Sequence, residues 1–89
     1  MRSSRVYNSI KDIVQAGFTL LEANSNDLNN DQFLLWFAYS SSELERVSKS
    51  YNPSIYTNYL RLQILVSNSS ASQKLNACLI YLVEVMKSI

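Results

Sequence analysis

The stretch FLLWFAYSSSELERV, residues 33–47, decides the fold, because its first half is apolar and its second half is polar and charged. At 100° per residue, one side of a helix over this stretch carries an apolar stripe of Phe33, Trp36, Phe37, Leu44 and Val47. Leu34 and Ala38 point elsewhere, so one end of the helix is apolar nearly all round. We expect this helix at the centre of a helical packing, covered from more than one direction.

The composition indicates one folded helical domain. The chain has 89 residues, enough for a single modest core, and it is 47% hydrophobic and 17% charged, which is too apolar for a disordered protein. One Gly and one Pro are too few for the many hairpin turns of an all-β protein. The longest apolar runs, at 33–39 and 77–83, are far shorter than the roughly 20 residues that span a membrane.

Several classes of function are disfavoured by the residues that the chain lacks. It has no His and one Cys, so the common zinc sites and a His-based catalytic triad are excluded. Cys78 is expected to be a buried small hydrophobe. Gly17 is the only glycine, which excludes a glycine-rich phosphate loop, and a net charge of +1 gives no bulk attraction for nucleic acid. We expect no enzyme, no cofactor, no metal and no nucleic-acid partner.

The N-terminus lacks the apolar segment of a signal peptide, since Asn8, Lys11 and Asp12 interrupt it. We therefore expect a cytoplasmic protein.

Four segments have helical periodicity, at about 4–23, 31–50, 53–67 and 70–88, and together they predict an all-α, antiparallel up-down-up-down four-helix bundle. The stripe of the first helix is Val6, Ile10, Ile13, Val14, Gly17 and Leu21, and that of the fourth is Leu75, Cys78, Leu79, Leu82, Val85, Met86 and Ile89. Gly17 on its stripe suggests a close helix crossing. Three serines at 40–42 leave a break in the second helix open, although a continuous helix is favoured because its stripe stays in phase.

Polar residues mark the boundaries between these helices. The Asn- and Asp-rich residues 24–31 predict a loop that ends in an N-cap at Asn30 or Asp31. Asn52 and Pro53 suit the N-cap and first position of the third helix. Ser70 has the capping-box spacing to a glutamine three residues later, which predicts the start of the fourth helix.

Surface recognition is the function class that remains. The third helix has one apolar face with Ile55, Tyr59, Leu62 and Val66, and a second apolar row of Tyr56, Leu60 and Ile64. One face is enough for packing in a bundle, so the second row suggests a partner or dimer contact. Tyr51 adds aromatic area near the start of this helix, and Arg61 and Lys74 would be charges at the rim. In the alternative, Tyr59 is core while Tyr51 and Tyr56 only wrap the end of the bundle.

The order of these features resembles the enterocin A immunity family, the immunity proteins of pediocin-like (class IIa) bacteriocins. The resemblance rests on the Asn- and Asp-rich loop, a helix with Leu34, Leu35 and Ala38 followed by Leu44, Glu45 and Lys49, and Asn52-Pro53 opening a helix with Ile55 and Leu62. It covers most of the chain. The family has no catalytic motif, and its fold is an antiparallel four-helix bundle.

The resemblance implies a protein of a Gram-positive bacterium that stays inside the cell and protects it from an antimicrobial peptide. Family members are thought to recognise the peptide on its membrane receptor, the mannose phosphotransferase permease, through their C-terminal half, which here contains Tyr56, Arg61 and Lys74. Longer members have an extended tail, whereas this sequence stops at Ile89, so we expect weaker peripheral membrane association. The alternative function is a helical adaptor or phage-encoded inhibitor that forms a homodimer through Tyr56, Leu60 and Ile64.

Overall fold

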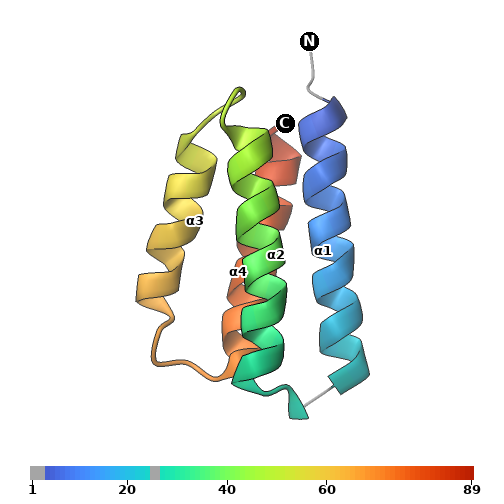
Figure 1. Cartoon of the computed structure of the whole chain (residues 1–89), viewed down its shortest axis with the longest axis vertical. Coiled ribbons are helices and arrows are strands. Elements are labelled where there is room, and N and C mark those ends of the chain that lie inside the picture. The colour runs from blue at the N-terminus through green and yellow to red at the C-terminus, as the bar shows by residue number, and fades with distance from the viewer. Residues whose placement is uncertain (1–3, 25–26) are drawn as a thin grey trace.

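The computed structural model describes residues 4–24 and 27–89, and these form four helices. They are α1 (Ser4–Asn24), α2 (Asn30–Ser48), α3 (Ser54–Leu65) and α4 (Ala71–Ser88). The described residues contain no strand, so the predicted all-α, four-helix fold is confirmed. Consecutive helices run in opposite directions in Figure 1, and α1 and α3 each pack against both α2 and α4, which is compatible with an up-down-up-down bundle.

The second helix is continuous across its three serines, as the in-phase stripe indicated. Ser40 is buried, and its hydroxyl donates to the backbone oxygen of Phe37 at 3.1 Å. This bond satisfies the polar side chain within its own helix, so the backbone does not have to break to do so. The helix stops at Ser48 rather than near residue 50, because residues 49–51 form a turn that leads to Pro53.

The apolar end of α2 is covered from three directions and open on the fourth. Helices α1, α3 and α4 all pack against α2. Phe33, Trp36, Leu44 and Val47 are buried and Phe37 is half-buried. On the other side, Leu34, Leu35, Ala38 and Tyr39 stay exposed, and Leu35 is 76% exposed. An apolar surface therefore remains on the outside of this helix.

The core lies along the predicted stripes. In α4, Leu75, Cys78, Leu79 and Leu82 are buried, while Val85, Met86 and Ile89 are partly buried against them. The Trp36 indole N–H donates to the backbone oxygen of Ile13 at 3.2 Å, which satisfies the polar atom of a side chain that is otherwise packed between helices. Leu28 is buried beneath the connection from α1 to α2. No helix within the described ranges has both the length and the apolarity to cross a bilayer.

Side chains cap α2 and α4. The prediction of Asn30 or Asp31 as the α2 cap is wrong: Asn29 is the N-cap, and Asn29 and Gln32 each accept a hydrogen bond from the other's backbone N–H at 2.9 Å. Ser70 and Gln73 form the predicted capping box of α4. At α3, the Asn52 side-chain oxygen accepts from the Ser54 backbone N–H at 3.2 Å. The prediction of Asn52 as the N-cap and Pro53 as the first position is therefore wrong by one residue, because Pro53, which has helical dihedral angles, is the N-cap and α3 begins at Ser54.

Gly17 lies at a close crossing of α1 with its neighbours, as its position on the stripe suggested. A Cβ atom there would lie 2.6 Å from Leu79 Cδ2 and 3.0 Å from Trp36 Cζ2. Both distances are shorter than ordinary van der Waals contact. The absence of a side chain therefore lets α1 approach both α2 and α4 at this level of the bundle.

Candidate binding surface

Tyr59 fixes how α3 is rotated in the bundle. Its side chain is fully buried, and its ring stacks between Phe37 of α2, at a centroid distance of 5.5 Å, and Tyr81 of α4, at 5.9 Å. Its hydroxyl lies 2.7 Å from Ser40 Oγ. Because the Ser40 hydroxyl already donates to Phe37, the Tyr59 hydroxyl is the donor in this pair. Tyr59 is thus a core residue, and the side of α3 away from it must face outward.

Polar contacts hold α3 against α4 as well. Gln63 Nε2 of α3 donates to Cys78 Sγ of α4 at 3.4 Å, and the Tyr81 hydroxyl of α4 donates to the Ile55 backbone oxygen of α3 at 2.7 Å. Burial raises the pKa of Tyr59 above its ordinary range, and it also raises the pKa values of the Cys78 thiol and the Tyr81 hydroxyl. All three groups are therefore held in their neutral forms, which suits structural contacts rather than acid–base chemistry.

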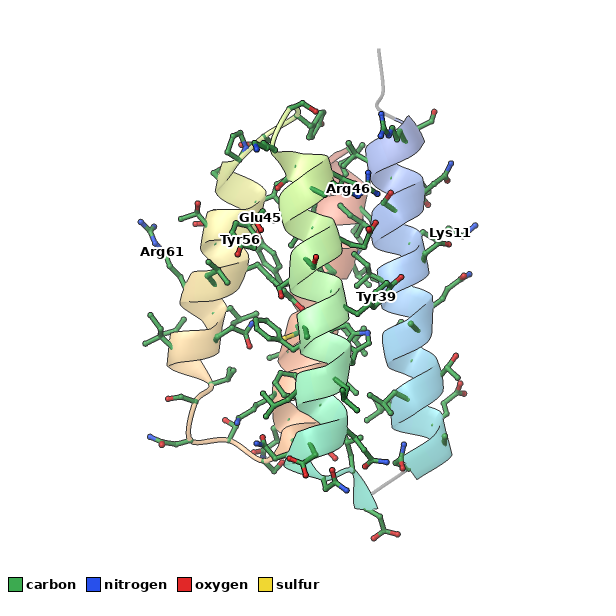
Figure 2. All side chains as sticks on the ribbon, viewed as in Figure 1. Lys11, Tyr39, Glu45, Arg46, Tyr56 and Arg61 are labelled. Atoms are coloured by element: carbon green, nitrogen blue, oxygen red, sulfur yellow. The ribbon has the colours of Figure 1, made fainter. Side chains whose placement is uncertain are left out.

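The second apolar row of α3 faces outward. Tyr56 is half-buried, Leu60 is 38% exposed and Ile64 is 75% exposed. Tyr56 and Glu45 lie in the space between α3 and α2 (Figure 2). Tyr56 therefore borders the seam between these two helices, and Leu60 and Ile64 are the accessible members of the row.

Two shallow depressions lie along this seam, each of about 180 Å³. The first is lined by Glu45, Ser48, Lys49, Pro53, Tyr56 and Thr57. The second, at the opposite end of the seam, is lined by Phe33, Leu34, Phe37, Gln63, Ser67 and Lys74. We call this region the α2–α3 surface and define it by seven residues: Leu34, Glu45, Lys49, Tyr56, Leu60, Ile64 and Lys74.

The structure brings some of the predicted site residues together and separates others. Tyr56, Leu60 and Ile64 share one side of α3, and Lys74 lines the second depression opposite Gln63, which also belongs to α3. Lys74 Nζ lies 5.8 Å from the centroid of the Phe33 ring and donates to Asn30 Oδ1 at 3.3 Å. Tyr51, 43% exposed, lies in the turn between α2 and α3.

Arg61 is set apart from this group. Its side chain points away from the bundle on the far side of α3 from α2 (Figure 2). A ligand seated on the seam would contact Lys74 and Lys49 before it reached Arg61.

Three exposed leucines, Leu34, Leu35 and Leu65, were missed as candidate site residues. Leu34 is 48% exposed and lines the second depression, and Leu65, the last residue of α3, is 82% exposed. The apolar surface is thus concentrated where α2 begins and α3 ends. The sequence contained a signal for Leu34, which lies off the apolar stripe of its helix, but gave none for Leu65, which directly precedes a serine-rich turn.

The acidic residues do not converge on a common point. Glu43 is hydrogen-bonded by Arg46, with an N–O distance of 2.7 Å, and this bond lowers the pKa of the carboxyl. Glu84 pairs with Lys87 at 3.2 Å. Within residues 4–24 and 27–89, no three His, Cys, Asp or Glu side chains are grouped as they would be around a metal ion.

Comparisons of the chain with protein-family models, curated proteins and solved structures find no match.

Proposed function

We propose that this protein is a non-catalytic bacteriocin immunity protein that acts by binding a protein partner through the α2–α3 surface. One observation carries the binding part of the proposal: α3 buries Tyr59 on one side and exposes Leu60 and Ile64 on the other. A helix that only completed a bundle would need the first side alone. Exposed, contiguous apolar side chains rimmed by charge are typical of contact surfaces.

The immunity part of the proposal rests on the resemblance to the enterocin A immunity family. The four-helix architecture agrees with the fold that the resemblance implies. Four of the residues that define the α2–α3 surface, namely Tyr56, Leu60, Ile64 and Lys74, belong to the third and fourth helices, the C-terminal half to which the family's specificity is attributed. The partner would be the complex of a pediocin-like peptide with its membrane permease, approached from the cytoplasm, where the protein would associate peripherally with the membrane.

A protection assay tests this proposal. The protein would be expressed in a sensitive Gram-positive strain, and the strain challenged with a panel of pediocin-like peptides. We expect protection against at least one peptide. Failure to protect against any of them, with the protein present in the cells at a detectable level, would count against the immunity function.

A matched pair of variants tests the surface. Ile64→Glu places a charge at a position that is 75% exposed on the α2–α3 surface, whereas Ile80→Glu does so at a position that is 59% exposed on α4. Both variants should fold, because neither side chain is in the core. We expect Ile64→Glu to abolish protection and Ile80→Glu to retain it. Equal protection by the two variants would show that the α2–α3 surface is not the contact.

The alternative, a homodimeric adaptor, uses the same row of Tyr56, Leu60 and Ile64. It predicts a tight dimer in solution that Leu60→Glu dissociates. The immunity proposal requires no dimer through this row. Sedimentation of the wild type and of Leu60→Glu therefore separates the two hypotheses without any bacteriocin.

A further inference from the structure

A second exposed apolar surface lies between α1 and α4, away from the α2–α3 surface. Phe18 is 45% exposed and Ile80 is 59% exposed. They line a shallow depression of about 210 Å³ together with Asn76, Leu79, Val83 and Glu84. This surface is not part of the site proposed above.

The close crossing at Gly17 creates this surface. Gly17 lacks a side chain where α1 meets Leu79 of α4. The residues that follow these two in the sequence, Phe18 and Ile80, are therefore brought to the same level of the bundle. Because Leu79 is buried beneath them, the two exposed side chains stand on a packed base.

Charges of opposite sign lie on either side of this apolar centre. Lys11, Phe18 and Glu22 are spaced by seven and four residues, so they share one side of α1, with the lysine toward its start and the glutamate near its end. Figure 2 shows Lys11 on the side of α1 away from α2. The described residues form two ion pairs, Glu43–Arg46 and Glu84–Lys87, so neither Lys11 nor Glu22 has an ionic partner within them.

We propose that the protein forms a two-fold symmetric homodimer through this α1–α4 surface. In an isologous contact the same patch occupies both sides of the interface. A two-fold axis that lies in the interface, perpendicular to α1 and close to Phe18 and Ile80, brings the apolar centres of the two copies together. The same rotation reverses the direction of α1, so it places Lys11 of each copy toward Glu22 of the other. The patch is thus complementary to itself both in apolar character and in charge.

The α1–α4 side of the bundle is large enough to contact a second copy of the chain. A stable interface buries about 800 Å² on each copy, roughly one seventh of the 5602 Å² of accessible surface of this chain. Helices α1 and α4 have 21 and 18 residues and lie side by side in a bundle whose longest extent is 41 Å, so together they offer a continuous side of that size. This proposal does not depend on the immunity function, because the α2–α3 surface stays open in such a dimer.

Sedimentation velocity tests the interface. We expect the wild type to show a concentration-dependent equilibrium between monomer and dimer, and Ile80→Glu to raise the dissociation constant at least about tenfold. Ile64→Glu is the matched control, being exposed on the other surface, and should leave the dissociation constant unchanged. Circular dichroism would verify that both variants are folded. A wild type that stays monomeric up to about 1 mM overturns the proposal, since that is the weak limit of specific association. So does a dimer that Ile64→Glu dissociates and Ile80→Glu does not.

A charge reversal tests the arrangement of the two copies. Lys11→Glu and Glu22→Lys should each weaken the dimer, because each brings like charges together, and the double variant should recover most of the wild-type affinity. The effect should shrink in high salt, since the pairs lie at the rim of the interface. Failure of the double variant to recover would overturn the two-fold arrangement.

Discussion

The Tyr59 hydroxyl and the Ser40 hydroxyl meet at 2.7 Å inside the bundle, where each side chain has 1% of its surface exposed or less. The two residues are not equivalent in this bond. Ser40 also donates to the Phe37 backbone oxygen, whereas the Tyr59 hydroxyl has Ser40 as its oxygen acceptor and the sulfur of Cys78, a weaker acceptor, close by. The bond links the middle of α2 to the middle of α3, so it helps to set how the outward row of α3 is presented.

This asymmetry predicts that Ser40→Ala destabilises the protein more than Tyr59→Phe does. The phenylalanine variant loses one net hydrogen bond, about 1 kcal/mol, while the alanine variant leaves a buried hydroxyl with only the weak sulfur acceptor of Cys78, at a cost of about 1–3 kcal/mol. Urea unfolding followed by circular dichroism measures both free energies. The double variant should be close to Tyr59→Phe alone, because no orphaned hydroxyl remains. Equal losses in the two single variants would contradict the assigned direction of the bond.

Gly17→Ala is predicted to destabilise the protein by about 1 kcal/mol, although alanine is the better helix former. Removing a mid-helix glycine gains about 1 kcal/mol, but over-packing a dense interior costs about 1–3 kcal/mol. The new Cβ would lie 2.6 Å from Leu79 Cδ2, and Leu79 is 1% exposed, so it has little room to move. The midpoint of thermal unfolding measures the net effect. Ala16→Gly, at an exposed position of the same helix, is the control for helix propensity alone. A stabilised Gly17→Ala variant would show that the crossing can open.

Periodicity was sufficient to predict the helices and most of the core. The apolar stripes of α1 and α4 predicted most of the buried residues of these helices, because a helix face that packs against two neighbours must be apolar along its length. The α2 cap was misplaced by one or two residues, since Asn29, Asn30 and Asp31 are all good caps. Gln32 could have decided between them, because only Asn29 has the capping-box spacing to it.

The open side of α2 could not be predicted in the same way. Phe33 to Tyr39 are all apolar or aromatic, so the periodic contrast that identifies a buried face is absent there. Which of them stay exposed depends on where α1, α3 and α4 lie, and that is a tertiary property. The hydrogen bond between Ser40 and Tyr59, nineteen residues apart, also depends on how α2 and α3 pack, so the sequence alone did not predict it. The candidate row of α3 was visible in the sequence, whereas its separation from Arg61 required the structure.

Alkaline pH is predicted to destabilise the fold. The folded-state pKa values of Cys78, Tyr59 and Tyr81 are all raised by burial, so their contribution to stability is complete below the unfolded-state values. The unfolded-state pKa values are about 8.5 for Cys and about 10 for Tyr. The stabilisation from each group is lost as the pH rises from its unfolded-state pKa toward its folded-state pKa. The buried Cys78 and Tyr59 then cost up to about 1.4 kcal/mol each per pH unit, and the partly exposed Tyr81 costs less because solvent screens its charge.

Urea unfolding at pH 7, at about pH 9.5 and at about pH 10.5 would measure this loss. Cys78→Ala should remove the decline that begins near pH 8.5 and retain the one that begins near pH 10. A free energy of unfolding that stays constant to about pH 11 would show that these groups ionise as easily in the folded chain as in the unfolded one.

The last prediction concerns the open side of α2 and compares two leucines of this helix that differ in burial. Leu44 has no exposed surface and Leu35 is 76% exposed, although both belong to the same helix. Leu44→Ala should cost about 2–5 kcal/mol, because it opens a cavity in the core, while Leu35→Ala should change the free energy of unfolding by less than about 0.5 kcal/mol. Chemical denaturation of the two variants side by side gives both values. If Leu35→Ala cost as much as Leu44→Ala, the Leu35 side chain would have to be buried. The exposed side of α2 described above would then be wrong.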